Sequence, residues 1–332
     1  MVSLPAAAAS GKHRRRDLLQ VCALQCLNPA VARDTLGRPS SPLMTALVSL
    51  DLADWRASAS VNTQDLAVKT IEGGGVLILP RLAFALAPSE RRFLSPQWSD
   101  DKAKNISFDG RTLKGARGSA SDLTDLARMV SRFAHCAAEL VSALFPRYAP
   151  FVERARTSFR PQPAVGRTVS WRKDDSRLHI DAFPSRPNRG ERILRVFSNV
   201  NPDEDRVWRV GDRFEAVARK FLPGIGRPLP GSAQLLAVLR VTKGLRSEYD
   251  HLMLALHDRA KADLDYQKSC PQQVVRFPPG STWLCFSDQV MHAAVSGQYM
   301  LEQTTHLPVS ALYDPQSSPL ATLERLRGKP LL

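Results

Sequence analysis

Cysteine is scarce in this chain of 332 residues, which contains five: Cys22, Cys26, Cys136, Cys270 and Cys285. An odd and widely scattered set does not make a disulfide framework, so we expect a reducing compartment. Cys22 and Cys26 are close in sequence, but no second pair of cysteines follows them. The sequence therefore gives little support to a structural zinc site.

Long apolar runs are also missing. The longest apolar stretch, at residues 134–145, contains His135 and Glu139 and is too short to span a bilayer, so we expect a soluble protein. Aromatic residues make up only 7% of the chain and do not interleave with its arginines. The base-stacking pattern of a nucleic-acid reader is therefore weak, and we predict no nucleic-acid partner.

Acidic residues are the minority charge. The chain has 46 Lys and Arg against 32 Asp and Glu, which gives a formal net charge of +14. Such an excess favours an anionic partner, and nucleic acid, an anionic membrane surface or an acidic substrate would each satisfy it. The hydrophobic content of 43% argues against disorder over most of the length.

The chain divides into three parts by composition. Residues 1–43 combine an alanine run, a basic cluster at 12–16 and a Pro/Ser-rich end, which indicates a disordered basic tail or sequence preceding a true start at Met44. Residues 44–315 are predicted to form one domain, with a mixed helical part at 44–150 and a strand-rich part at 151–315. Residues 316–332 are predicted as a C-terminal extension.

Hydrophobic periodicity predicts several elements within that domain. A helix capped by Ser121 is expected up to Phe145, a second helix at 247–266 and a surface loop at 97–118. Strands are expected at 75–79, 177–183, 192–199, 273–277, 281–286 and 290–295. Turn residues at 278–280 and 287–289 predict that the last three strands form a tight antiparallel succession.

The pair His179 and Asp181 is the strongest candidate for chemistry. In a strand, residues two apart point to the same face, so both side chains would look the same way. His292 follows two turns and an apolar strand, and it is the best candidate for a third ligand. Two histidines and one carboxylate form the facial triad of Fe(II) oxygenases, which leaves positions open for O2 and a co-substrate. The competing third ligands are His251 and His257, expected at the surface of a helix, and His306, expected to be structural.

An oxygenase of this type usually needs a 2-oxo acid, whose distal carboxylate binds a buried cation. Many such enzymes place an arginine about ten residues after the second histidine, but residues 293–303 here contain no Lys or Arg. Arg195, in an otherwise apolar strand, is the main candidate, and Arg160 is the next. A buried salt bridge between Arg195 and a protein carboxylate is the alternative.

Basic residues crowd the sequence around the proposed ligands. Residues 154–195 contain eleven Lys and Arg against four Asp and Glu. This segment is either a solvated charged face or the lining of a site for an anionic substrate, for which Arg172, Arg177 and Arg186 are candidates. Trp171, Phe183 and Trp283 are candidates for pocket walls, with core packing as the alternative for each.

Three stretches of the sequence, SWRKDDSRLHIDAFPSRP at 170–187, GERILRVFSNVNP at 190–202 and VWRVG at 207–211, resemble the Kdo 3-hydroxylase family of Gram-negative bacteria. The resemblance extends over roughly residues 45–315. It implies an α+β fold with a double-stranded β-helix, or cupin-like jelly-roll, core at 151–315 flanked by helices. It also implies that His179, Asp181 and His292 hold iron and that Arg160 and Arg195 bind 2-oxoglutarate.

The activity implied by this resemblance is that of an Fe(II)/2-oxoglutarate-dependent dioxygenase. Such an enzyme uses O2 to hydroxylate C3 of 3-deoxy-D-manno-octulosonic acid (Kdo) on lipid A precursors, giving the sugar Ko with release of succinate and CO2. The substrate is an anionic glycolipid on the cytoplasmic face of the inner membrane, so a cytoplasmic enzyme with peripheral membrane contact is expected. The sequence is also compatible with a homo-oligomer.

Two other functions remain open from the sequence. One is an oxygenase of the same fold that acts on another anionic substrate. The other is a non-catalytic jelly-roll protein that binds anionic glycans, whose binding would be indifferent to His179→Ala.

Overall fold

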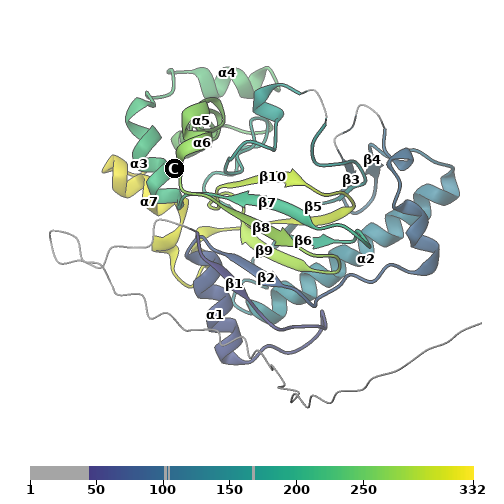
Figure 1. Ribbon diagram of the computed structural model, residues 1–332. Helices are drawn as coiled ribbons and strands as arrows, with labels where there is room; N and C mark the ends of the chain where they lie inside the picture. Colours follow the sequence, from purple (N-terminus) through teal and green to yellow (C-terminus); the bar gives the residue numbers. More distant parts are fainter. Residues whose placement is uncertain (1–44, 101–102, 104, 167–168) are drawn as a thin grey trace, which may run out of the picture. The chain divides into compact units, whose positions relative to one another are not determined.

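A computed structural model describes residues 45–332 except 101, 102, 104, 167 and 168 (Figure 1). The predicted tail at 1–43 and the alternative start at Met44 lie outside the described residues. Of the helices within the described part, none is both long and apolar enough to cross a membrane.

A large sheet of eight strands forms the centre of the fold. Its order is β1-β2-β9-β6-β11-β5-β3-β4, and all neighbouring strands are antiparallel except β1 and β2. In chain order these strands are β1 (Leu47–Ser49), β2 (Val76–Leu79), β3 (Ile106–Phe108), β4 (Leu113–Lys114), β5 (Glu153–Arg160), β6 (Arg192–Asn199), β9 (Thr282–Phe286) and β11 (Met300–Leu307).

A second sheet of three strands packs against one face of the first. Its order is β10 (His292–Ser296), β7 (Arg206–Val210) and β8 (Gln273–Phe277). Aromatic side chains fill the space between the sheets: Phe277 of β8 stacks on Trp283 of β9 with ring centroids 3.9 Å apart, and Phe197 of β6 meets Trp208 of β7. Two sheets closed over a shared aromatic core confirm the predicted jelly-roll core flanked by helices. Trp283 therefore belongs to this core, and it is absent from the lining of the pocket described below.

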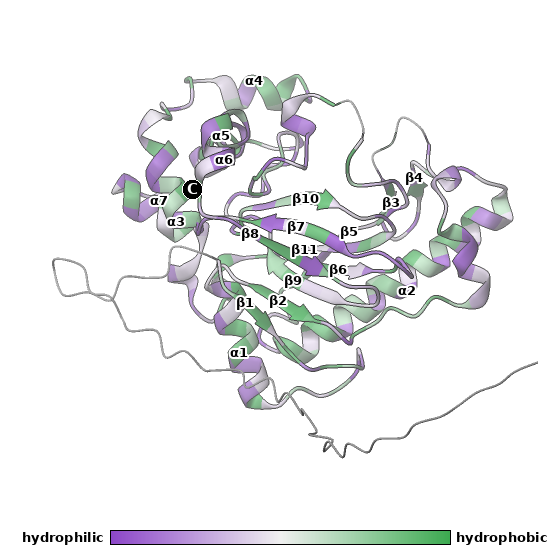
Figure 2. Cartoon of the chain, viewed as in Figure 1, coloured by the Kyte–Doolittle hydropathy of each residue, from purple (hydrophilic) through white to green (hydrophobic). Residues whose placement is uncertain are grey.

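Two helices cover the outer face of the large sheet. They are α1 (Val61–Glu72) and α2 (Ala120–Leu144) (Figure 2). The second of them buries Leu126, Phe133 and Leu140 at helical spacing. The N-cap of α2 is Ser119 and not the predicted Ser121, because Ser119 and Asp122 form a reciprocal capping box.

A second group of helices packs near the small sheet and the proposed metal ligands. It comprises α3 (Phe214–Phe221), α4 (Ser232–Val238), α5 (Glu248–Ala262), α6 (Leu264–Ser269) and α7 (Pro319–Arg327). Leu323 and Leu331 are buried in the apolar cluster that α3, α5, α6 and α7 share with Leu178 and Ile180. Residues 316–332, expected as an extension, thus contribute to the packing beneath the candidate site. Short 3-10 helices are η1 (Pro88–Phe93), η2 (Pro96–Trp98), η3 (Trp171–Lys173), η4 (Leu222–Gly224), η5 (Val309–Ala311) and η6 (Pro315–Ser317).

The structure also differs from the predicted elements elsewhere. The helix expected at 247–266 is divided at Asp263 into α5 and α6. The loop expected at 97–118 contains the end of η2 and the strands β3 and β4, of which β4 forms the edge of the large sheet. The strand expected at 177–183 is reduced to one bridge between His179 and His292. The last three strands do not pair with one another: β8 and β10 both flank β7, while β9 lies in the large sheet between β2 and β6. The turns at 278–280 and 287–289 therefore carry the chain from one sheet to the other, which is what a jelly roll requires.

Candidate metal centre

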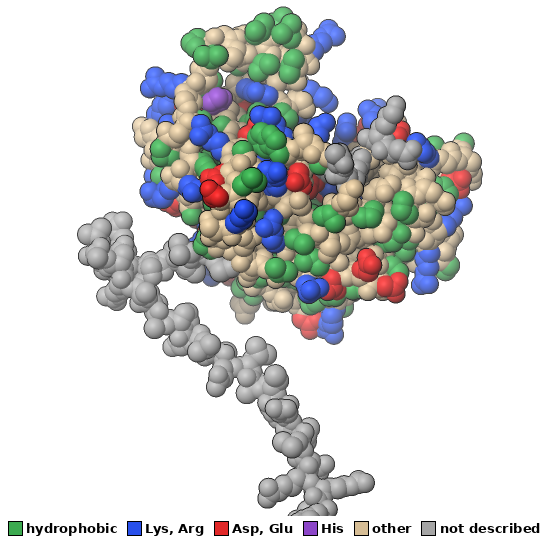
Figure 3. All heavy atoms as spheres, turned by 45° about the horizontal axis from the view of Figure 1, so that its top comes forward, with side chains coloured by type: hydrophobic (Ala, Val, Ile, Leu, Met, Phe, Trp, Pro, Cys, Tyr) green, Lys and Arg blue, Asp and Glu red, His purple; other side chains and the backbone are tan. Residues whose placement is uncertain are grey.

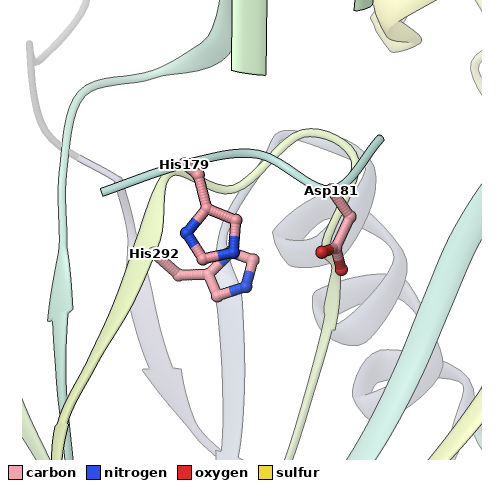
Figure 4. Close-up of side chains that lie close together, drawn as sticks. All are labelled: His179, Asp181 and His292. Atoms are coloured by element: carbon pink, nitrogen blue, oxygen red, sulfur yellow. The ribbon is translucent and has the colours of Figure 1, made fainter. Parts of the chain in front are cut away.

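His179, Asp181 and His292 converge at the edge of the small sheet. The first two come from one extended segment, and His292 is the first residue of β10 (Figure 4). The main chains of His179 and His292 exchange two hydrogen bonds of 3.0 and 2.9 Å, and the amide of Asp181 donates to Ser287 O at 2.8 Å. One potential ligand atom from each of the three residues lies within 4.8 Å of the others. The three residues thus meet the spacing of a single metal ion.

The packing of the neighbouring residues explains why the side chains of His179 and Asp181 face the same way. Leu178 and Ile180 are fully buried in the apolar cluster on the helical side, so the alternating residues point to the opposite side. The segment is not a regular strand because α6 takes the place of a second neighbouring strand. The Gln267 side chain accepts from the amide of Leu178 at 2.7 Å and donates to its carbonyl at 2.9 Å.

Both imidazoles are oriented by their backbone. His179 Nδ1 lies 2.8 Å from Arg177 O, and His292 Nδ1 lies 2.9 Å from Val290 O. A carbonyl can only accept, so each Nδ1 carries the proton and each Nε2 keeps a lone pair for a metal. Burial lowers the pKa of both histidines, and for His179 the nearby His292 lowers the pKa further. Both rings are therefore neutral bases at neutral pH, which is the form that binds metal.

Asp181 completes the set as a carboxylate. Burial alone would raise its pKa, but the positive charge of Arg195 holds the pKa below its ordinary value. Its Oδ2 atom is buried and accepts no hydrogen bond from the described residues, although Arg195 Nη2 lies 3.1 Å away. Two Nε2 lone pairs and an ionised oxygen with spare acceptor capacity fit a divalent cation such as Fe(II).

The turn before His292 is fixed by a buried ion pair. Arg192 Nε lies 2.7 Å from Asp288 Oδ2, and both side chains are fully buried. Asp288 also accepts from the amide of Ile193, so this turn is fastened to the start of β6. The carbonyl that receives the amide of Asp181 belongs to the neighbouring Ser287. The Arg192–Asp288 pair thus supports the backbone that positions two of the three candidate ligands.

A chain of alternating charges leads inward from the carboxylate ligand. Arg195 lies 3.1 Å from Asp181 and 3.0 Å from Glu302, and Arg160 lies 2.7 Å from Glu302 and 3.6 Å from Asp175. Glu302 occurs ten residues after His292, in the stretch where the sequence lacks a cation. The two arginines come from β6 and β5, the strands on either side of the β11 strand that carries Glu302. Both candidate co-substrate cations are therefore already paired with protein carboxylates.

A pocket of about 960 Å³ lies over the candidate metal ligands. Its lining includes His179, Asp181 and Arg160, whereas Arg195 is not part of the lining. Pocket volumes of this order suit a small-molecule or cofactor site. The pocket also reaches Asp175 and the pocket-facing side of α5.

Arg206 of β7 is a cation of this pocket that sequence reasoning missed. It is 3% exposed, lines the pocket and donates from Nη1 to Gly297 O at 2.9 Å. Among the described residues no carboxylate lies within 4.0 Å of it, and its buried Nε has no hydrogen-bond partner. Burial and the nearby Arg160 lower its pKa to about 10, so it stays charged at neutral pH. The signal available in the sequence was its place in the stretch Arg206–Val210, where it alternates with Trp208 and therefore faces inward with it.

The three arginines predicted to meet a substrate lie at different depths. Arg172 lines the pocket and pairs with Asp258 at 3.1 Å. Arg177 lies outside the pocket lining, where it contacts Asp174 and the carbonyl of Lys261. Arg186 is also outside the lining, 3.9 Å from Glu153. Only the first of them is placed to touch a molecule in the pocket.

Of the aromatic residues predicted to form pocket walls, Trp171 and Phe183 are half-buried and lie beside arginines. Arg172 lies over the Trp171 ring at 4.1 Å, and Arg195 lies 5.9 Å from the centre of the Phe183 ring. Neither ring is part of the pocket lining.

The competing histidines do not join the cluster. His257 was expected at the surface, but it lines the pocket, its ring centroid is 5.5 Å from that of His179, and its Nδ1 pairs with Asp258. His251 contacts the carbonyl of Gly226, and His306 is buried in β11. Among the described residues, the group able to hold a metal consists of His179, Asp181 and His292.

Comparisons with known proteins agree with this geometry. A search of curated proteins gave no match. A solved structure of the Kdo hydroxylase KdoO, a non-heme Fe(II) α-ketoglutarate-dependent dioxygenase in complex with cobalt(II), is 49% identical with a TM-score of 0.84, over 86% of this chain and 97% of that chain. KdoO structures with α-ketoglutarate and Fe(III), and with succinate and Fe(III), are each 48% identical with TM-scores of 0.83 over the same shares. The profile of the 3-deoxy-D-manno-oct-2-ulosonic acid (Kdo) hydroxylase family matches residues 54–330, and the chain belongs to this family.

Proposed function

We propose that this protein is an Fe(II)- and 2-oxoglutarate-dependent dioxygenase that hydroxylates Kdo. The observation that carries the proposal is the convergence of two oriented imidazoles and one ionised carboxylate beneath a pocket lined with cations. Membership of the Kdo hydroxylase family and the likeness to KdoO structures with iron and α-ketoglutarate support the same chemistry. The net reaction converts the sugar, O2 and 2-oxoglutarate into the hydroxylated sugar, succinate and CO2.

The iron ligands are proposed to be His179, Asp181 and His292. When bound, Fe(II) supplies the redox chemistry that couples 2-oxoglutarate decarboxylation to hydroxylation, while the protein supplies positioning. The bridge between His179 and His292 sets the separation of the two imidazoles. Arg195 keeps Asp181 ionised, so it acts on the metal site through the ligand.

The distal carboxylate of 2-oxoglutarate is proposed to meet the group of inward-facing arginines on β5, β6 and β7. Arg160 and Arg195 were predicted for this role from the sequence, and both are paired with Glu302. Arg206 is added to them because it is buried, lines the pocket and has no carboxylate partner among the described residues. A buried cation of this kind is costly unless an anion completes it.

The sugar acceptor is proposed to be Kdo within a lipid A precursor, hydroxylated at C3. Kdo carries a carboxylate, and the pocket lining includes Arg172, Lys173 and Lys261. Arg177 and Arg186 stay as candidates for contacts outside the pocket lining. The excess positive charge of the chain suits a phosphorylated glycolipid. Such a substrate is consistent with action at the cytoplasmic face of the inner membrane.

Anaerobic binding of Fe(II) and 2-oxoglutarate, followed by succinate release with and without a Kdo-lipid A precursor, tests the proposal. We expect both ligands to bind and succinate release to rise when the glycolipid is added. Iron and 2-oxoglutarate binding with no response to the glycolipid would reject the acceptor and favour another anionic substrate. Glycolipid binding that is unchanged by His179→Ala, without iron binding, would favour a non-catalytic glycan-binding protein.

A further inference from the structure

Exposed apolar side chains are concentrated in one segment of the surface, residues 227–246. Sixteen large hydrophobic residues of the described part are exposed, and six of them fall within these twenty residues. They are Leu229, Leu235, Val238, Leu239, Val241 and Leu245. Scattered exposed apolar residues are normal, but a contiguous patch marks an interaction site.

The patch is built on the outward face of α4. Leu235, Val238 and Leu239 are spaced three and four positions apart, so they lie on one face, and they are 59%, 79% and 61% exposed. Leu229 precedes the helix and is 78% exposed. Figure 3 shows hydrophobic side chains gathered at the top of the view, where α4 lies, with Lys and Arg beside them. Burying this face would remove a large apolar area from water.

The charge of the segment is of one sign. Between Glu215 and Glu248 the sequence contains no Asp or Glu, while residues 227–246 contain Arg227, Arg240, Lys243 and Arg246. The first three are exposed and stand next to the apolar residues. An exposed apolar segment whose own charged residues are all cations is complementary to an anionic bilayer, where the cations meet headgroups and the apolar groups enter the acyl boundary.

The patch is also joined to the mouth of the candidate active-site pocket. The amide of Lys243 donates to Ser185 O at 2.9 Å, and Arg246 donates to the carbonyl of Pro184, which lines the pocket. Residues 227–246 lead directly into α5, whose His257 and Lys261 form part of the pocket wall. A surface that rests on a membrane at this position would hold the pocket beside the headgroups.

We propose that residues 227–246 dock the enzyme on anionic lipid bilayers and thereby present the pocket to sugars carried by membrane lipids. This assignment rests on the proposed function for its purpose, since a lipid-linked acceptor explains why the pocket and the docking surface adjoin. The binding itself depends on the apolar and basic side chains of the segment and needs neither iron nor 2-oxoglutarate.

Vesicle co-sedimentation tests the proposal with the full chain. The wild type is expected to sediment with phosphatidylethanolamine–phosphatidylglycerol vesicles and weakly with phosphatidylcholine vesicles. The triple variant Leu235→Gln, Val238→Gln, Leu239→Gln is expected to lose about tenfold or more of its partition coefficient. The pair Arg240→Gln, Lys243→Gln is expected to remove most of the preference for anionic vesicles and its salt dependence.

A matched control keeps the test specific. Val61, Leu264 and Val274 are 70%, 54% and 63% exposed and lie outside the segment, so their triple Gln variant is expected to bind vesicles like the wild type. Equal melting temperatures of the variants show that folding is intact. Wild-type protein that ignores anionic vesicles, or a 235/238/239 variant that binds them undiminished, would overturn the proposal. The proposal would also be overturned if the triple Gln variant at 235, 238 and 239 lost self-association while its vesicle binding stayed unchanged.

Activity measurements distinguish bilayer docking by residues 227–246 from the proposed Kdo hydroxylation. With a Kdo acceptor that lacks acyl chains, the triple variant at 235, 238 and 239 is expected to match wild-type succinate release. With the acceptor in anionic vesicles, the variant is expected to be slower. Absence of turnover on both acceptors, together with loss of vesicle binding in the variant, would reject the proposed function and leave the docking surface standing.

Discussion

The properties of single residues define the candidate metal site. His179 and His292 each lose the freedom to rotate because Nδ1 is held by a backbone carbonyl. We expect His179→Ala or His292→Ala to weaken anaerobic Fe(II) or Co(II) binding by about 100-fold or more, because a missing ligand costs more than a missing partner of a ligand. His257→Ala is the matched control, since this ring lies nearby in the pocket but pairs with Asp258. Metal affinity that falls equally in all three variants would contradict the assignment.

Arg206 is a buried arginine of the pocket that has no carboxylate partner among the described residues, so we expect it to bind an anion. We expect Arg206→Gln to weaken the binding of a carboxylate by about 10- to 100-fold, the effect of losing a charge-assisted hydrogen bond. Succinate release without a sugar acceptor gives the apparent affinity for 2-oxoglutarate, and titration with the acceptor gives that for the sugar. If the apparent affinity for 2-oxoglutarate falls, Arg206 binds the carboxylate of 2-oxoglutarate; if the apparent affinity for the sugar falls, Arg206 binds the carboxylate of the sugar. Arg276→Gln serves as comparison, because the side chain of this arginine is 70% exposed and lies outside the pocket lining. Unchanged affinities for both molecules would remove Arg206 from the site.

The burial of His306 predicts that the stability of the protein depends on pH. It is buried in β11 with an unpartnered Nδ1, and burial, Arg186 and Arg195 lower its pKa to about 4 from the ordinary 6.5, against the opposing charge of Glu153. The unfolded chain binds a proton near pH 6.5 and the folded chain only near 4, so stability is lost as pH falls through this window. The loss is up to about 3 kcal/mol. Denaturant unfolding at pH 7 and at pH 4.5 is expected to show a smaller difference for His306→Gln than for the wild type. An unaltered pH dependence would assign the loss to other groups.

At the scale of elements, the turn between β9 and β10 couples stability to the candidate metal site. We expect Asp288→Ala to lower the free energy of unfolding by about 3–5 kcal/mol, because it leaves Arg192 charged and buried without its partner. Asp288→Asn keeps the size and part of the hydrogen bonding, so its loss is expected to be smaller. Co(II) affinity is expected to fall with stability, since Ser287 in the same turn holds the amide of Asp181. A stable Asp288→Ala protein would show that the pair does not support the turn.

Elements with a strong local pattern were predictable from the sequence. The strand at 192–199 has the bounds of β6, and the helix expected up to Phe145 is α2 with an N-cap two residues earlier. The pairing of the last three strands was not predictable, because a turn of three residues can form a hairpin or cross between sheets. That choice is made by the aromatic packing of Trp208, Phe277 and Trp283.

The candidate site was predictable to a different extent for each part. The spacing of His179 and Asp181 with a later His292 suggested the triad that the fold brings together. The partners of Arg195 were not predictable, since Asp181 and Glu302 reach it from different parts of the chain. Arg206 was missed because its alternation with Trp208 indicates which face of the strand it occupies, but not that a pocket lies over that face.

In the molecule as a whole, the apolar cores and the candidate active-site pocket occupy different parts of the jelly roll. The outer face of the large sheet is closed by α1 and α2, and the space between the sheets is closed by aromatic rings. The remaining opening is where inward-facing arginines, the candidate metal ligands and α5 meet. The pocket and the 227–246 surface are then neighbouring features of one domain, as the proposed docking on a bilayer requires.

Isotopically labelled O2 shows whether the proposed site transfers oxygen to Kdo. Purified protein with Fe(II), 2-oxoglutarate and a Kdo-lipid A precursor is analysed by mass spectrometry of the released sugar and of succinate. We expect one labelled oxygen atom in the sugar and one in succinate, and neither product with His179→Ala. Labelled succinate with an unmodified sugar, or sugar hydroxylation that survives His179→Ala, would contradict the proposed function.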